Sequence, residues 1–329
     1  MTTLKKIFRL SLSIGLAILF LWLIAHQINT NELKKAFVGT NTSWIMIALI
    51  AFFLGYVCRI NRWCLMLQCD NPTLRWKHCS GPLLASFAAN NVLPFRAGDV
   101  LRAFAFNRRL GVSSGIVMAT LFVERLLDLL MVLLLLGVAL AVLGLDVSNF
   151  AGVGSAALVA IAIGILLLLL FPQLFAPIAI ASGKLVARLA PKLGQKLLQE
   201  INKSLEMLVH LSKGGTMIRL VVWSIAAWLA EGCVFWFAAI ALSSITIPTA
   251  GWLALPVGTL ATLIPSTPGY VGTFDYFTVR AMCALGNNLV AATAYALLVH
   301  VLLWLPPTLI GGVYLLLHPT KKQNKSKAL

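Results

Sequence analysis

Long uninterrupted apolar runs dominate this chain and limit what it can fold into. Several reach the roughly 20 residues that a helix needs to cross about 30 Å of hydrocarbon, and none shows the short alternating pattern of a barrel strand. The 329 residues are 60% hydrophobic and 11% charged, with a mean hydropathy of +0.92, outside the range of a soluble domain of this length. The sequence therefore predicts an all-α, polytopic helical membrane protein.

Six of the apolar runs are predicted to be full spans. They are expected at 10–28, 43–64, 115–143, 150–171, 218–241 and 289–317. The first is interpreted as a retained span rather than a signal peptide, because it is long for a signal's apolar region and no A-x-A-like cleavage site follows it. We expect one integral membrane domain over 1–320 and a basic, disordered tail over 321–329.

The net charge is +16, and the basic residues are distributed as expected for loops on one side of a membrane rather than for a nucleic-acid-binding surface. Three of the 26 Lys and Arg precede the first span, eight lie between Arg59 and Arg109, seven between Lys184 and Arg219, and four in the tail. This bias predicts that the N- and C-termini are both cytoplasmic. Attraction to anionic lipid headgroups explains the basic loops, so nucleic acid is not expected as a partner.

Motifs for cofactors and metals do not occur in the sequence. The five His are scattered without ligand spacing, and the six Cys form no C-x-x-C pair. Nucleotide-binding and zinc-protease motifs are missing too. We therefore expect no metal, no cofactor and no disulfide, and an enzymatic function is disfavoured but left open.

Two apolar segments, 80–106 and 252–286, are each interrupted by a P-x-x-x-G motif, in the stretches LPFRAGD and IPSTPGY. Counting spans places the two segments on opposite faces of the membrane, a pattern typical of transporters whose broken helices meet near the midplane. This pattern predicts two re-entrant segments and leaves an inverted repeat open. The alternative is a pair of interfacial turns between short helices. The expected hinges are Pro94, Gly98, Pro265, Pro268 and Gly272.

The first interruption carries candidate ligands for an anionic lipid headgroup. Arg96 and Arg102 offer bidentate donors suited to a phosphate or a carboxylate. Asp99 lies three residues before Arg102 and suits the N-cap of the returning helix. If Asp99 neutralises Arg102, then Arg96 is the freer anion ligand, and the opposite assignment stays open.

The second interruption carries no Arg, but its hydroxyl and backbone N–H groups can also face an anion. Ser266, Thr267 and Gly269 are the headgroup-binding candidates here. Asp275 follows as a carboxylate for an amine headgroup, a proton carrier, or a partner for Arg280, and the ion pair with Arg280 is favoured. Glu231 is the remaining acid within a predicted span.

The stretch LFVERLLDLL places a charge cluster of Glu124, Arg125 and Asp128 inside a span. Glu124 and Asp128 share one helix face, and Arg125 is within reach of Asp128. Intramembrane charges normally face the bundle interior, pair, and mark a functional site. A clamp that holds this span to the segment with Arg96 and Arg102 is an equally open interpretation, and the two roles can coexist.

The stretch 184–213 differs in kind from the spans. Its leucines recur at helical spacing while its lysines lie on other faces. This pattern predicts a cytoplasmic amphipathic helix on the inner leaflet.

Three blocks of this chain resemble, in order, those of the lysylphosphatidylglycerol synthase transmembrane family, also called the UPF0104 or flippase-like family. They are LPFRAGDVLRAF, VERLLDLL and IPSTPGYVGTFD. Asp275 stands where the family has Glu, which shortens the reach by one methylene. The resemblance covers nearly the whole chain. It implies a lipid-handling helical module with re-entrant segments, located in a bacterial or archaeal cytoplasmic (inner) membrane.

The favoured hypothesis is a flippase-like transporter that moves or binds an anionic phospholipid or lipid-linked intermediate. Its expected partners are membrane lipids, and a homo-oligomer or an enzyme of a lipid pathway is left open. The alternative is a membrane enzyme or accessory subunit in phospholipid or lipid-linked glycan modification, with Asp99, Glu124 and Asp128 as acid–base or headgroup-binding groups. A membrane scaffold is a third hypothesis.

Overall fold

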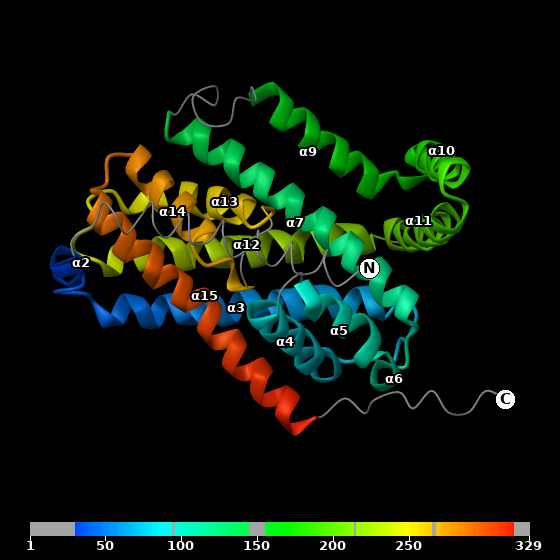
Figure 1. The fold of residues 1–329 in the computed structure, drawn as a ribbon, viewed down its shortest axis with the longest axis horizontal. Helices are drawn as coiled ribbons and strands as arrows, with labels where there is room; N and C mark the ends of the chain where they lie inside the picture. The colour runs from blue at the N-terminus through cyan, green and yellow to red at the C-terminus, as the bar shows by residue number, and fades with distance from the viewer. Residues whose placement is uncertain (1–29, 94–95, 145–154, 214, 265–267, 319–329) are drawn as a thin grey trace.

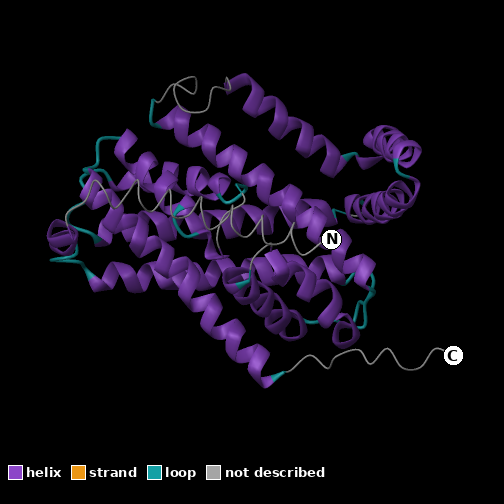
Figure 2. Cartoon of the chain, viewed as in Figure 1, coloured by secondary structure: helices purple, strands orange, loops and turns teal. Residues whose placement is uncertain are grey.

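Helices make up the regular structure of the described chain (Figure 2). A computed structural model describes residues 30–93, 96–144, 155–213, 215–264 and 268–318. No strand occurs in those ranges. The helices long and apolar enough to cross a membrane are α3 (Thr42–Leu67), α7 (Ser114–Val142), α12 (Thr216–Ala241) and α15 (Leu289–Leu317). The prediction of an all-α polytopic membrane protein is confirmed.

Polar cap residues set the start of three of these long helices. The side chains of Asn41, Ser113 and Asn288 each accept a hydrogen bond from a backbone N–H of the following first turn. The first N–H groups of a helix have no partner within it, so a cap stabilises the end. The fourth helix, α12, starts after Gly215, whose φ of +72° favours glycine. A short helix, α2 (Thr30–Ala36), precedes α3.

Helices α3 and α12 lie side by side along much of their length (Figure 1). Small residues allow this approach, because a Cβ atom on Gly55 would lie 3.5 Å from the carbonyl oxygen of Ala227 and from the side chain of Ala230. Lipid gives helices no hydrophobic reason to associate, so close packing of small residues is a common basis of membrane helix pairs. This contact fixes the polar residues of the two helices relative to each other.

The first broken segment is a helical hairpin of α4 (Trp76–Val92) and α5 (Ala97–Ala105), followed by the short α6 (Asn107–Leu110). Helix α5 folds back onto α4 at Gly98, where a Cβ atom would lie 1.9 Å from the carbonyl oxygen of Ser86. Glycine is therefore required for the contact between the two helices. The residues 94 and 95, which include the predicted hinge Pro94, lie outside the described chain.

The second broken segment follows a 3-10 turn, η2 (Pro248–Ala250), and has three parts. They are α13 (Gly251–Ala261), the 3-10 turn η3 (Pro268–Tyr270) and α14 (Thr273–Ala284). The turn depends on two glycines, because Gly269 has a φ of +70° and Gly272 a φ of +85°. Both predicted interruptions are therefore present, and an inverted repeat remains a prediction.

The prediction of six full spans is only partly matched. Four of them correspond to the four long helices, and the run 10–28 lies outside the described residues. The described part of 150–171 is α9 (Ser155–Leu170), which continues into α10 (Pro172–Leu189) after a bend of 100°. The prolyl residue that begins α10 has no backbone N–H and cannot continue the hydrogen bonds of α9. A sharply bent pair therefore stands where one straight span was predicted.

The helix predicted over 184–213 is divided in the structure. Residues 184–189 complete α10, and α11 (Pro191–Ser212) begins after a break at Ala190. A proline causes this break too. Pro191 has no backbone N–H and cannot continue the hydrogen bonds of α10, but it is tolerated in the first turn of α11. Helix α11 packs on α10 and on α7. Its position on the inner leaflet remains a prediction.

We expect Gly98→Ala to lower the free energy of unfolding by about 1–3 kcal/mol, because the added methyl group overpacks the α4–α5 contact. Thermal or denaturant unfolding of the purified protein in detergent measures the effect. The matched control is Gly137→Ala on α7, where a Cβ atom would meet nothing within 4 Å. Equal stability of the two variants would show that the α4–α5 contact accommodates a methyl group.

Candidate functional site

The two interruptions meet in the structure. The Nε of Arg96 donates a hydrogen bond to the hydroxyl of Tyr270 at 2.9 Å, and the guanidinium carbon lies 5.9 Å from the centre of that ring. These are also the non-glycine residues of the described chain with positive φ, 51° for Arg96 and 61° for Tyr270. Left-handed backbone at a non-glycine residue is uncommon and clusters at functional sites. The two residues with left-handed backbone, one from each break, are thus hydrogen-bonded to each other.

A second contact joins the breaks through α15. The indole Nε1 of Trp304 donates to the carbonyl oxygen of Asn91 at 3.3 Å, and the side-chain amide of Asn91 donates to Thr308 at 2.8 Å. Gly269 fits between these groups because it has no side chain. A Cβ atom added at this position would lie 2.7 Å from the Trp304 indole nitrogen and 3.3 Å from the Asn91 carbonyl oxygen. A glycine is therefore required at 269 by both its φ and its surroundings.

A cavity of about 210 Å³, lined by both polar and apolar residues, lies between the two breaks. Residues of both broken segments line it, together with residues of α3, α7, α12 and α15. Irregular backbone at membrane depth is tolerated where it is buried in protein or faces such a cavity. The charged and titratable groups of the lining are Tyr56, Arg96, Asp99, Arg125, Glu231, Tyr270 and His300.

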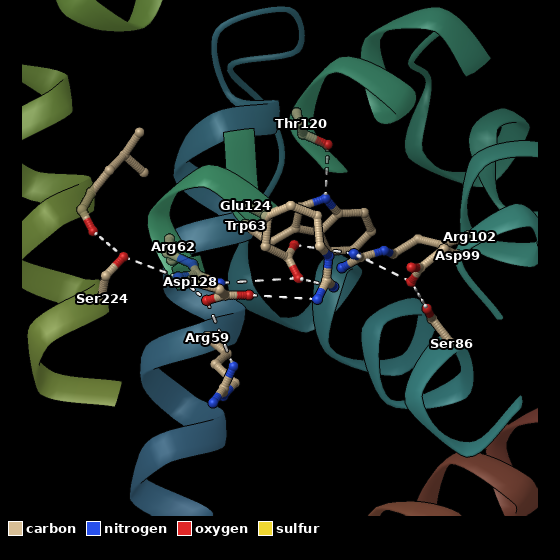
Figure 3. A network of polar contacts seen from close by, with 12 residues as sticks. Arg59, Arg62, Trp63, Ser86, Asp99, Arg102, Thr120, Glu124, Asp128 and Ser224 are labelled. Atoms are coloured by element: carbon tan, nitrogen blue, oxygen red, sulfur yellow. Dashed lines mark hydrogen bonds and ion pairs between the residues drawn. The ribbon is translucent and has the colours of Figure 1, made fainter. Parts of the chain in front are cut away.

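A network of buried charges adjoins the cavity, with Asp128 at its centre (Figure 3). The Nη1 atom of Arg62 lies 2.9 Å from the Oδ1 atom of Asp128, and the closest nitrogens of Arg59 and Arg125 lie 3.9 and 3.7 Å from the carboxylate. Trp228 donates to the same carboxylate at 3.2 Å. Asp128 therefore connects α3, α7 and α12.

Glu124 is the second centre of the network. Its carboxylate lies 3.1 Å from Arg102, 3.2 Å from Arg125 and 4.0 Å from Arg62. The side chains of Arg62 and Arg102 are each 1% exposed, so solvent does not screen these pairs. Arg102 also stacks on Trp63, with its guanidinium carbon 4.9 Å from the ring centre. Glu124 therefore ties α5 to α7.

The network is electrically balanced. Its ion pairs join four arginines to four carboxylates, and the pair of Arg59 with Glu231 on α12 completes it. Buried charges are costly unless they are paired and hydrogen-bonded. Among the described residues, no carboxylate pairs with Arg96, which is held by the neutral Tyr270 instead. The members of the network are Arg59, Arg62, Asp99, Arg102, Glu124, Arg125, Asp128 and Glu231.

The placement of Asp99 differs from the predicted N-cap. Helix α5 begins after Arg96, so Asp99 lies in its first turn and accepts a hydrogen bond from the amide of Asn90 at 3.0 Å. Arg102 approaches Asp99 only to 4.0 Å and binds Glu124 more closely. Of the two arginines predicted for the headgroup, Arg102 is buried in the network and Arg96 lines the cavity.

The predicted ion pair of Asp275 with Arg280 is wrong. Asp275 accepts the backbone N–H of Gly272 at 2.8 Å and lies 2.7 Å from the Nδ1 atom of His300 on α15. Arg280 follows five residues later on α14 and forms no ion pair with Asp275. It is exposed and lines a separate, largely apolar groove of about 650 Å³ between α7, α9, α13 and α14.

Several predicted residues lie outside the described chain. These are the hinges Pro94 and Pro265 and the hydroxyl residues Ser266 and Thr267; for Pro268 the backbone alone is described. Their part in a headgroup site therefore remains a prediction. Within the described residues, no group of three or more His, Cys, Asp or Glu could hold a metal ion.

Sequence reasoning missed several residues that the structure places in the site. Arg59 and Arg62 were counted with the basic loops, although both belong to the buried charge network. Their position near the end of a long apolar run was the available signal. Tyr270 and His300 carried no signal, because their partners lie far away in the sequence.

Comparisons with known proteins agree on one family. The family model described as lysylphosphatidylglycerol synthase TM region matches residues 10–311. UPF0104 membrane protein MJ1078 of Methanocaldococcus jannaschii is 23% identical over 224 residues, covering 68% of this chain and 91% of that protein. UPF0104 membrane protein MJ1595 of the same organism is 24% identical over 125 residues, which is 37% of each chain. The chain therefore belongs to the lysylphosphatidylglycerol synthase transmembrane family and is a membrane protein of the UPF0104 type.

Proposed function

We propose that this protein is a flippase-like lipid transporter that binds the anionic headgroup of a phospholipid, or of a lipid-linked intermediate, in the cavity between its two broken segments. The proposal depends on the surroundings of Arg96. This residue of the first break lines the cavity, donates a hydrogen bond to Tyr270 of the second break, and pairs with no carboxylate among the described residues. A guanidinium in this state is suited to bind a phosphate.

The balance of charge in the buried network supports this assignment. Arg62 and Arg102 neutralise Asp128 and Glu124 within the protein, so they have no charge left for a ligand. Arg96 gives the cavity a positive group that no carboxylate of the described residues pairs with. An anion that enters the cavity would supply such a partner.

The polar side chains of the cavity also suit a headgroup that moves while its acyl chains stay in lipid. Asn90, Asn91 and Thr262 line the cavity beside the charged groups. These groups can replace part of the water that a headgroup loses, and without such replacement desolvation of its charge would be prohibitive. The alternative role as an enzyme gains no comparable support, because Glu124 and Asp128 are bound to arginines rather than free for proton transfer.

We expect Arg96→Ala to reduce transport of an anionic lipid at least tenfold, because the alanine removes the one guanidinium of the described cavity lining that pairs with no carboxylate. Fluorescent phosphatidylglycerol in proteoliposomes, with chemical quenching of one leaflet, gives the rate. Arg219→Ala is the matched control, since Arg219 is exposed at the start of α12 and lies outside the cavity. Equal rates for the wild type, Arg96→Ala and protein-free vesicles would refute the proposed function.

We expect Asp128→Asn to destabilise the fold by about 3 kcal/mol, because it leaves Arg62 buried without its closest negative partner. Unfolding of the purified protein in mixed micelles measures the loss. Asp70→Asn, at an exposed acid outside the network, is the matched control. Unchanged stability with abolished transport would instead assign the network a direct part in transport.

A further inference from the structure

His300 and Asp275 form a buried pair that the charge network does not include. The Nδ1 atom of His300 lies 2.7 Å from the Oδ1 atom of Asp275, whose other oxygen accepts the N–H of Gly272 at 2.8 Å. The side chains are 14% and 5% exposed. The ring of Phe274 packs edge-on against the imidazole at 5.5 Å. The pair therefore joins α14 of the second break to α15.

The position of the pair gives it access to the proposed headgroup site. His300 lies near the middle of α15, a helix long enough to cross the membrane, and it lines the same cavity as Arg96. Ionisable residues at such depth are costly and commonly belong to substrate or proton pathways. Histidine is also the side chain whose charge ordinarily changes between about pH 5 and pH 8.

The geometry defines where a proton would bind. An ionised carboxylate only accepts hydrogen bonds, so the Nδ1 atom that faces Asp275 carries the hydrogen when the ring is neutral. The Nε2 atom then holds the free lone pair, and no residue of the described chain forms a hydrogen bond with it. A proton taken up at Nε2 gives an imidazolium that is still bonded to Asp275. This step changes the charge of the pair from −1 to 0.

We propose that His300, positioned by Asp275, is a proton-binding site whose occupancy is linked to that of an anionic headgroup on Arg96. The inference rests on the proposed function and adds a linked proton to it. Protonation of the pair removes one negative charge from the wall of the cavity, so an anion binds more tightly to the protonated protein. Linkage is reciprocal, so binding of the anion takes up a proton.

Other titratable groups face the same cavity from the surrounding helices and have to be separated from His300 by experiment. Asp99 and Glu231 are each paired with an arginine of the network. Arg125 pairs with Glu124 and Asp128. Among the described lining residues, the charged and titratable ones other than His300 are Tyr56, Arg96, Asp99, Arg125, Glu231 and Tyr270.

The test measures binding of dioctanoyl phosphatidylglycerol to the full-length protein in uncharged detergent, at about pH 5.5 and about pH 8. We expect wild type to bind about fivefold or more tightly at the lower pH, and calorimetry in two buffers of different ionisation enthalpy to show proton uptake. His300→Gln is neutral at both values, so its affinity should stay at the high-pH level. His318→Gln is the matched control, since His318 stacks on Tyr314 outside the cavity.

The outcomes separate this inference from the proposed function. Binding that needs Arg96 but is equally tight at both pH values, or a pH dependence that survives in His300→Gln, overturns the proton site and leaves the headgroup site intact. Binding that is unaffected by Arg96→Ala overturns both. If His300→Gln fails to fold, proton uptake by the wild type decides, and an uptake near zero contradicts the inference.

Discussion

The pairing of buried arginines with buried carboxylates is the interaction on which the rest of this structure depends. Helices α3, α5, α7 and α12 each contribute charges to one neutral network, and burying any of these charges without its partners would be costly. Asp128 and Glu124 each contact three arginines, so moving one helix would break several pairs at once. In a bilayer, where helices gain little from burying apolar surface against each other, such a network fixes their relative positions.

The charge network also positions the two breaks relative to each other. It holds α5 through Arg102, and α5 in turn presents Arg96 to Tyr270 of the second break. The left-handed backbone at both residues persists only where the surroundings enforce it. The glycines at 98 and 269 provide the close packing that does so. The cavity between the breaks is thus a product of the network, the glycines and one hydrogen bond between strained residues.

Much of the fold could be predicted from the sequence, because hydrophobic length alone identifies a membrane helix. Four of six spans and both interruptions were located from apolar runs and from Pro and Gly positions. The bend at Pro172 was missed because a proline at the first position of a helix leaves the apolar pattern intact. The site was less predictable, since pairings such as Asp275 with His300 depend on how two distant helices pack. Local spacing favoured Arg280 instead, and that prediction was wrong.

Arg125 connects the network to the cavity and shows how the two can communicate. Its side chain is 38% exposed and lines the cavity, while its nitrogens lie 3.2 Å from Glu124 and 3.7 Å from Asp128. A phosphate bound to Arg96 would attract the same guanidinium, and any shift of Arg125 toward the ligand would weaken its pairs with the two carboxylates. Arg62 and Arg102 remain in place to neutralise them. Each of the two carboxylates contacts three arginines, so a shift of Arg125 alone would leave neither of them without an ion pair.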